Sequence, residues 1–354
     1  MTDARDPLAG RIPVTLITGF LGSGKTTLLA RLVRHPDMRN AAVVINEVGE
    51  IGIDHDLVTM SSESITLLAN GCICCSVRTD LQETLRDLFA RRRVGEIPDF
   101  DRVIVETTGL ADPAPVVQTL VSDTLLAAHY RLDGMVTLVD AVNGASQLAG
   151  HAEPAKQIAL ADRIFISKSD LASPEALAAL QAEVGAFNPR SRVSLLLNGV
   201  VDPSQLTGLG LASARAGVAT LSFLGEPLDG SGSAGERSLG QRGGLHDASI
   251  RTLSLRFDQP FHWPALSAAL DLLATLRGPD LLRIKGIVNV DGAPVVVQAV
   301  QHIFHPPVTL DRWPSADRDP RLVFITRNIE AATIRNLLDA VGAMAAPSQS
   351  GPAG

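Results

Sequence analysis

The stretch Gly19-Phe-Leu-Gly-Ser-Gly-Lys25-Thr26 matches the phosphate-loop pattern G-x-x-x-x-G-K-[ST]. It follows an apolar run of strand length, 14–18, and opens an amphipathic segment, 26–34, which is the context the pattern requires. Glycines in such a loop let backbone N–H groups turn inward around phosphate oxygens, and the helix N-terminus adds partial positive charge. Lys25 is expected to reach the β- and γ-phosphates, and the Thr26 hydroxyl to ligate Mg²⁺. The glycines expected to shape the loop are Gly19, Gly22 and Gly24.

Apolar runs alternate with amphipathic segments through the first 220 residues. This alternation predicts an α/β fold of the P-loop NTPase type, with a mostly parallel sheet and helices on both faces. The predicted strands are 14–18, 41–46, 64–68, 103–106, 135–139 and 163–166. The predicted helices are 26–34, 79–93, 157–161 and 174–184.

The pattern changes at a glycine-rich stretch, 229–244, which has almost no apolar content and is typical of a linker. Beyond it, the alternation in 249–257 predicts a half-buried strand, and Asp291-Gly292 between two apolar runs predicts a hairpin. Helices are expected at 263–276 and 329–341, and a further strand at 321–327. These elements predict a smaller C-terminal α+β domain with an antiparallel sheet. The expected organisation is a nucleotide domain at 1–225, a linker at 226–248, the second domain at 249–344 and a disordered tail at 345–354.

A second phosphate element, Glu106-Thr-Thr-Gly109, follows the apolar run Val-Ile-Val. A carboxylate at the end of that strand can hold Mg²⁺ directly or through water. The amide of Gly109 can approach the γ-phosphate and so respond to its presence.

The segment Ser167-Lys-Ser-Asp170 follows another predicted strand. Guanine carries two neighbouring donors, and the carboxylate of Asp170 can accept both. Lys168 can lie along the base plane. This segment therefore predicts guanine selectivity, although the usual form of the motif begins with Asn.

All three cysteines of the chain, Cys72, Cys74 and Cys75, lie within four positions. Clustered thiols in a reducing compartment indicate metal binding or redox chemistry, and three thiolates suit Zn²⁺ or a similar cation. If the strand predicted at 64–68 runs parallel to the first, the thiols lie at the same sheet edge as the phosphate loop. An incomplete set of ligands suits a metal in transit better than a closed structural site. The fourth ligand can be water, a nearby acid or a group of a recipient protein.

Polar residues after the strand at 41–46 occupy the position where nucleotide hydrolases carry their switch loops. Glu47, Glu50 and His55 are candidate switch or metal-proximal residues there, with Glu50 the tentative metal ligand. A solvated polar loop is an equally good interpretation of each of them alone.

The charge and hydropathy of the chain exclude other classes of protein. The net charge of −7 argues against nucleic-acid binding, which needs a basic surface. No apolar run reaches the ~18 residues that cross a bilayer, and the polar residues 1–11 lack the apolar stretch of a signal peptide. A cytoplasmic protein with no membrane contact is expected.

Taken in order, GFLGSGKTTLL, NEVGEIGIDHDLV, LANGCICCSVRTDL, VETTGLADPAPV and SKSD resemble the CobW-type P-loop GTPases. LLRIKGIVNVDG and VVVQAVQHIF resemble the C-terminal domain of that family, so the resemblance covers nearly the whole chain. It implies a slow GTPase that acts as a metal chaperone for zinc or cobalt and delivers the metal to a client metalloprotein. The metal, the client, the residue that positions water and the oligomeric state, a homodimer included, are left open.

The resemblance also implies roles for individual residues. GTP and Mg²⁺ would be bound by Gly19, Gly22, Ser23, Gly24, Lys25, Thr26, Thr27, Lys168 and Asp170, and the metal by Cys72, Cys74 and Cys75. The catalytic group would be Lys25, Thr26, Glu106 and Gly109. The chain departs from the family at Ser167, which replaces Asn or Thr, at Ile45, where some relatives carry an acid, and in its linker, where only His246 stands in place of a His-rich run.

Two other interpretations remain. An ATP- or GTP-dependent kinase or ligase with redox-active thiols would share the phosphate loop, and so would a nucleotide-gated scaffold whose cysteines are incidental.

Overall fold

The computed structural model describes residues 8–46, 58–62, 65–68, 73–76, 81–211, 214, 220 and 250–344. The chain forms two compact units, one made of Met1–Ser213 with Gly243–Asp247 and the other of Ala214–Arg242 with Ala248–Gly354. The predicted linker, tail and switch residues Glu47, Glu50 and His55 lie outside the described residues.

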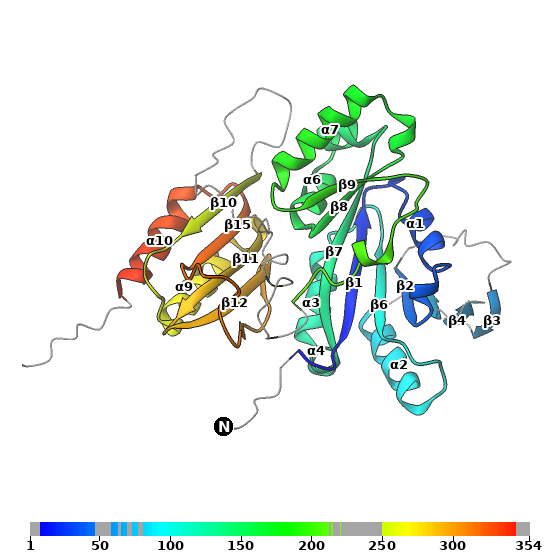
Figure 1. The fold of residues 1–354 in the computed structure, drawn as a ribbon, viewed down its shortest axis with the longest axis horizontal. Helices are drawn as coiled ribbons and strands as arrows, with labels where there is room; N and C mark the ends of the chain where they lie inside the picture. Colours follow the sequence, from blue (N-terminus) through cyan, green and yellow to red (C-terminus); the bar gives the residue numbers. More distant parts are fainter. Residues whose placement is uncertain are drawn as a thin grey trace, which may run out of the picture. The chain divides into compact units, whose positions relative to one another are not determined.

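The described strands of the first unit form a nine-stranded sheet in the order β3-β4-β5-β2-β6-β1-β7-β8-β9 (Figure 1). All pairings from β5 to β9 along this order are parallel, so these strands end at one edge. At the other end of the order, β4 is antiparallel to β5 and β3 is antiparallel to β4. The strand bounds are β1 Ile12–Gly19, β2 Ala41–Asn46, β3 Val58–Ser62, β4 Ile65–Leu68, β5 Ile73–Ser76, β6 Arg102–Thr107, β7 Tyr130–Asp140, β8 Arg163–Ser167 and β9 Arg192–Leu196.

Both faces of this sheet are buried. Ile17 of β1 belongs to a core that includes Leu28 and Leu32 of α1, whereas its neighbour Leu16 projects from the opposite face and is fully buried as well. On that sheet, α3 and α6 pack against β7. The predicted architecture, a parallel sheet between layers of helices, is confirmed. The helix bounds are α1 Lys25–Leu32, α2 Leu81–Val94, α3 Ala114–Ser122, α4 Thr124–His129, α5 Gly144–Gly150, α6 Ala152–Leu160 and α7 Pro174–Phe187.

The expected environment of the cysteines is corrected by the sheet. The strand predicted at 64–68, observed as β4, runs antiparallel to β5, so its carboxyl end does not lie at the phosphate-loop edge. Cys74 and Cys75 instead belong to β5 itself, a strand the sequence did not predict, and β5 is parallel to β2. A four-residue strand with two thiols carries no periodic pattern, and its pairing with β2 and β4 defines it.

The second unit contains an antiparallel sheet in the order β10-β15-β11-β12-β13, with β14 paired to β12. The expected hairpin at Asp291-Gly292 joins β11 to β12, and both residues have positive φ, at 51° and 91°. Helices α9 and α10 share one apolar core with the sheet, which confirms the predicted α+β domain. The bounds are β10 Ile250–Arg256, α9 Trp263–Arg277, β11 Leu281–Val290, β12 Ala293–Val300, β13 Ile303–Phe304, β14 Val308–Thr309, β15 Arg321–Arg327 and α10 Ala331–Met344.

Among the described residues, the structure has no helix with the length and apolar character needed to span a membrane.

The start of α2 is attached to the α3–α4 corner by one buried carboxylate. Asp123 accepts hydrogen bonds from Gln82 Nε2 at 2.6 Å and from Arg86, and it also caps α4 through the N–H groups of Leu125 and Leu126 at 2.9 Å. The hydrogen bond from Leu126 is the main cause that lowers the pKa of Asp123. Burial opposes this shift, and Arg86 adds to it.

The lowered pKa makes the stability contributed by Asp123 dependent on pH. Because the ionised form is favoured in the folded state, this stability is present above pH 3.8 and is lost as the pH falls through the lower, folded-state pKa. We expect Asp123→Asn to destabilise the protein at pH 6 and the difference from the wild type to shrink towards pH 3. Urea unfolding followed by circular dichroism at both pH values measures it. A difference that is constant or grows in acid would contradict the expectation.

Candidate functional site

The phosphate loop connects β1 to α1 in a conformation that only glycines adopt easily. Gly19, Gly22 and Gly24 all have positive φ, at 144°, 74° and 89°. A Cβ on Gly19 would lie 2.4 Å from the carbonyl oxygen of Leu138 in the neighbouring strand β7. The predicted glycine positions therefore agree with the backbone of the loop.

Lys25 begins α1 and turns back into the curve of the loop. Its Nζ donates hydrogen bonds to the carbonyl oxygens of Gly19 at 2.9 Å and Phe20 at 3.3 Å, and the residue is only 5% exposed. Because the loop backbone, the helix N-terminus and this ammonium group converge, the region favours a polyanion such as a nucleotide phosphate chain.

Thr26 and Glu106 bring two oxygen ligands together across neighbouring elements. Thr26 Oγ1 donates a hydrogen bond of 3.0 Å to Glu106 Oε1, and Glu106 is fully buried near the end of β6. A hydroxyl and a carboxylate are hard oxygen donors, the kind that Mg²⁺ prefers. This pair fits the predicted magnesium site.

The segment after β6 lies directly against the phosphate loop. A Cβ on Gly109 would meet the backbone nitrogen of Leu21 at 2.8 Å, so the residue has to be glycine for the two loops to touch. Next to this contact in the sequence, Thr107 Oγ1 donates a 2.9 Å hydrogen bond to Thr18 Oγ1, which joins β6 to β1.

Ser167, the residue that replaces the usual Asn, braces the phosphate loop. Its hydroxyl donates a hydrogen bond of 2.7 Å to the carbonyl oxygen of Ser23, and the residue is 4% exposed. In this chain a serine therefore supplies a contact between the guanine motif and the phosphate loop. Asp170, the expected guanine ligand, is exposed at the same sheet edge.

Lys168 is oriented by a residue that sequence reasoning missed. Its Nζ donates a hydrogen bond of 2.7 Å to Oδ2 of Asp140, a fully buried carboxylate at the end of β7. Burial raises the pKa of Asp140, but hydrogen bonds from Lys168, from the Asn143 side chain and from the N–H groups of Val142 and Asn143 outweigh it, so the pKa is lowered. Lys168 itself has a left-handed backbone conformation, with φ 54°. The only signal in the sequence was an acid that directly follows the apolar run 135–139.

The turn after β9 completes this edge, and it too was missed. A Cβ on Gly199 would lie 3.2 Å from the carbonyl oxygen of Thr27 in α1, and Ser169 Oγ donates 3.4 Å to the carbonyl oxygen of Leu196. The structure thus brings together the expected phosphate, magnesium and guanine residues at the carboxyl ends of the parallel strands.

The cysteine strand is related to this edge by backbone register. Ser76 of β5 pairs with Ile45 of β2, Ile45 pairs with Glu106 of β6, and Glu106 pairs with Ile17 of β1. Cys75 is one residue before this row. Because β2 lies between β5 and β6, the backbones of these two strands are about 10 Å apart. Cys72 lies outside the described residues. No three of the described His, Cys, Asp and Glu side chains come together as metal ligands.

Comparison with known proteins is consistent with this architecture. Residues 13–194 match the CobW/HypB/UreG nucleotide-binding domain, and residues 250–342 match the cobalamin synthesis protein cobW C-terminal domain. The chain is 33% identical to the zinc chaperone YjiA of Escherichia coli, over 92% of this chain and 96% of that protein. It is 32% identical to the zinc chaperone CobW of Pseudomonas aeruginosa, over 93% and 91%.

A solved structure extends the comparison to the fold. The crystal structure of Zn(II)-bound YjiA GTPase from E. coli matches with a TM-score of 0.71 and 29% identity, over 94% of this chain and 99% of that one. The phosphate loop, the strand order around it and the second domain therefore have the same explanation: the chain belongs to the CobW/HypB/UreG family and carries the CobW C-terminal domain, as its sequence motifs predicted.

Proposed function

We propose that this chain is a GTP-driven metallochaperone that binds zinc at Cys72, Cys74 and Cys75 and delivers it to a client metalloprotein. The observation that carries the proposal is the register that joins the thiol strand to the magnesium site. Cys75 is one residue before a row of paired residues that contains Glu106, and Glu106 contacts Thr26 of the phosphate loop.

The chain is a GTPase, as the family and its relative YjiA GTPase indicate. In the proposed site, Lys25 and the loop glycines bind the phosphates, while Thr26 and Glu106 hold Mg²⁺. Ser23 and Thr27 complete the phosphate and magnesium shell. Mg²⁺ would neutralise charge that develops on the phosphates. Gly109 would meet the γ-phosphate, because its backbone already touches the phosphate loop.

Guanine would be read by Asp170, with the stem of Lys168 against the base. The hydrogen bond from Lys168 to Asp140 supports this role, because it fixes the lysine at the sheet edge before any base arrives. The contact of Ser167 with Ser23 would keep the base site and the phosphate site at a constant separation.

Zinc is favoured as the cargo because three thiolates suit it and because two relatives carry the name zinc chaperone. Cobalt also accepts thiolates and remains the alternative. The open fourth position would accept water, an acid such as Glu50, or a ligand of the client.

Coupling would follow from the strand register, which places Cys75 one residue before the row that contains Glu106. GTP with Mg²⁺ would order the loop at 47–56 and the segment after Glu106. The first follows β2, which is next to the thiol strand β5, and the second follows β6, which is next to β2. Hydrolysis would release the γ-phosphate, loosen these loops and let the zinc move to a client by ligand exchange. A cytoplasmic location and a homodimer remain part of the proposal.

Nucleotide preference is tested by Asp170→Asn. The amide presents one acceptor oxygen and one NH₂ donor to the two guanine donors, so the second hydrogen bond is lost. We therefore expect the preference for GTP over ATP to fall at least ~tenfold. Competition binding with labelled GDP measures it, and Asp271→Asn, an exposed change in α9, serves as the control. An unchanged preference would favour the kinase or ligase interpretation.

The metal site is tested by replacing all three cysteines with serine. We expect the bound zinc to fall to near zero while GDP binding stays the same, and elemental analysis measures the stoichiometry. For the wild type, zinc affinity should differ at least ~tenfold between the GDP form and the form with a non-hydrolysable GTP analogue, within the usual range of coupling between sites. Equal affinities would remove the coupling, and normal stoichiometry in the triple variant would support the scaffold interpretation.

A further inference from the structure

Helix α6 presents a buried glutamine to the segment that follows β6. Gln157 is 1% exposed, and its Nε2 donates hydrogen bonds to the carbonyl oxygens of Gly109 at 3.2 Å and Ala111 at 3.1 Å. Both amide hydrogens of one side chain are therefore directed to the loop that touches the phosphate loop. The neighbouring Lys156 adds an ion pair with Asp112 at 2.5 Å.

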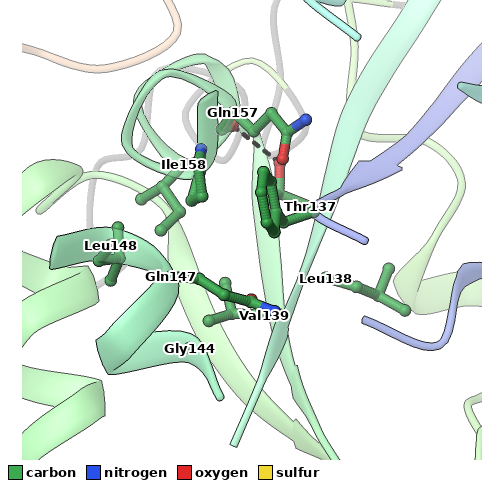
Figure 2. Close-up of a pocket in the computed structure, with 10 residues that line it drawn as sticks. Thr137, Leu138, Val139, Gly144, Gln147, Leu148, Gln157 and Ile158 are labelled. Carbon is green, nitrogen blue, oxygen red and sulfur yellow. Dashed lines mark hydrogen bonds between the residues drawn. The ribbon is translucent and has the colours of Figure 1, made fainter. Parts of the chain in front are cut away.

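The base of this glutamine is itself fixed. The backbone carbonyl of Gln157 accepts a 2.8 Å hydrogen bond from Thr137 Oγ1 of β7, which is drawn in Figure 2. The side chain lines a cavity of about 10 Å³ together with Phe20 of the phosphate loop, enough space for one water molecule. Gln157 therefore reaches the loop from a helix that is hydrogen-bonded to the sheet.

These contacts determine how the peptide planes of the loop are oriented. In a trans peptide the N–H points opposite to the carbonyl, so binding of the Gly109 carbonyl to Gln157 turns the Leu110 N–H away from α6. On its other side Gly109 meets Leu21. The segment is thus held between α6 and the phosphate loop with one choice of peptide orientation.

Packing alone does not explain a glutamine at this position. Its Oε1 is buried and has no hydrogen-bond partner among the described residues. Methionine has nearly the same shape, but it could not donate to the two carbonyls. The two donors are the property that distinguishes Gln157 from an apolar side chain.

We propose that Gln157 is a positioning residue for GTP hydrolysis, with Lys156 as a second support. It holds the segment 109–112 in the orientation that meets the γ-phosphate, and so its effect is specific to GTP. The inference rests on the proposed role of Gly109, but it does not depend on zinc.

A second glutamine provides an internal comparison. Nε2 of Gln147 in α5 donates a hydrogen bond of 3.2 Å to the carbonyl oxygen of Leu21, which belongs to the phosphate loop itself. That loop binds phosphates common to GDP and GTP. A change at Gln147 should therefore affect both nucleotides equally, whereas a change at Gln157 should separate them.

The test uses Gln157→Met in the full chain, with zinc absent, and Gln181→Met on α7 as the matched control. We expect kcat for GTP hydrolysis to fall about tenfold through loss of the two hydrogen bonds. Affinity for a non-hydrolysable GTP analogue should fall relative to the wild type, while affinity for GDP stays within about twofold, the margin expected for a contact that GDP does not use. The control should retain all three values.

A second variant tests the donors directly. The ionised carboxylate in Gln157→Glu cannot donate to the carbonyls, whereas the protonated acid donates one hydrogen bond. We therefore expect its activity relative to the wild type to recover as the pH is lowered from 8 to 6. Activity that does not recover in acid would contradict the role of these hydrogen-bond donors.

The outcomes separate this inference from the proposed function. Wild-type kcat in Gln157→Met, or an equal loss of GDP and GTP-analogue affinity, would overturn the positioning role and leave the chaperone proposal standing. If Gln157→Met behaves as expected but the zinc affinity of the wild type is the same in its GDP and GTP-analogue forms, only the proposed coupling between GTP and zinc would be overturned.

Discussion

The hydrogen bond between Thr26 and the buried carboxylate of Glu106 joins the phosphate loop to the neighbouring strand, and the site is arranged around it. It exists because β1 and β6 are parallel and adjacent, so the helix that follows one strand begins beside the end of the other. A buried carboxylate is costly unless it has partners, and this position supplies them. The proposed phosphate and magnesium sites and the contact of Gly109 with the phosphate loop all depend on that adjacency.

Polar contacts along the same edge then set the positions of the remaining groups. Ser167 connects the base site to the phosphate loop, and Asp140 holds Lys168. Each contact lies within or next to a buried strand end, where a hydrogen bond is less exposed to competition from water. The proposed base site is therefore joined directly to the phosphate loop.

Two glutamines extend this arrangement to the helices. Gln147 and Gln157 come from consecutive helices, and they contact the phosphate loop and the segment after β6 respectively. The nucleotide loops are thus supported from the layer of helices as well as from the sheet. Separately, Asp123 attaches the α3–α4 corner to α2.

The sequence alone identified the elements whose side chains are buried on both faces. Continuous apolar runs predicted β1, β2, β6 and β8, because parallel strands in a covered sheet need apolar residues on each side. The phosphate loop and the hairpin at Asp291-Gly292 were readable because their backbone conformations require particular residues at fixed spacing. Local patterns of this kind also indicated the family.

Only the tertiary structure decided features that depend on pairing between distant segments. The direction of β4 and the existence of β5 follow from neighbouring strands, since four-residue segments have no period of their own. Asp140 and Gln157 were not recognisable as site residues, because an acid after a strand and a glutamine in a helix are common and their partners are 28 and 48 residues away in the chain. Local residue patterns can indicate which segments form strands and loops, but hydrogen bonds between segments distant in sequence are made only when the strands have taken their order in the sheet.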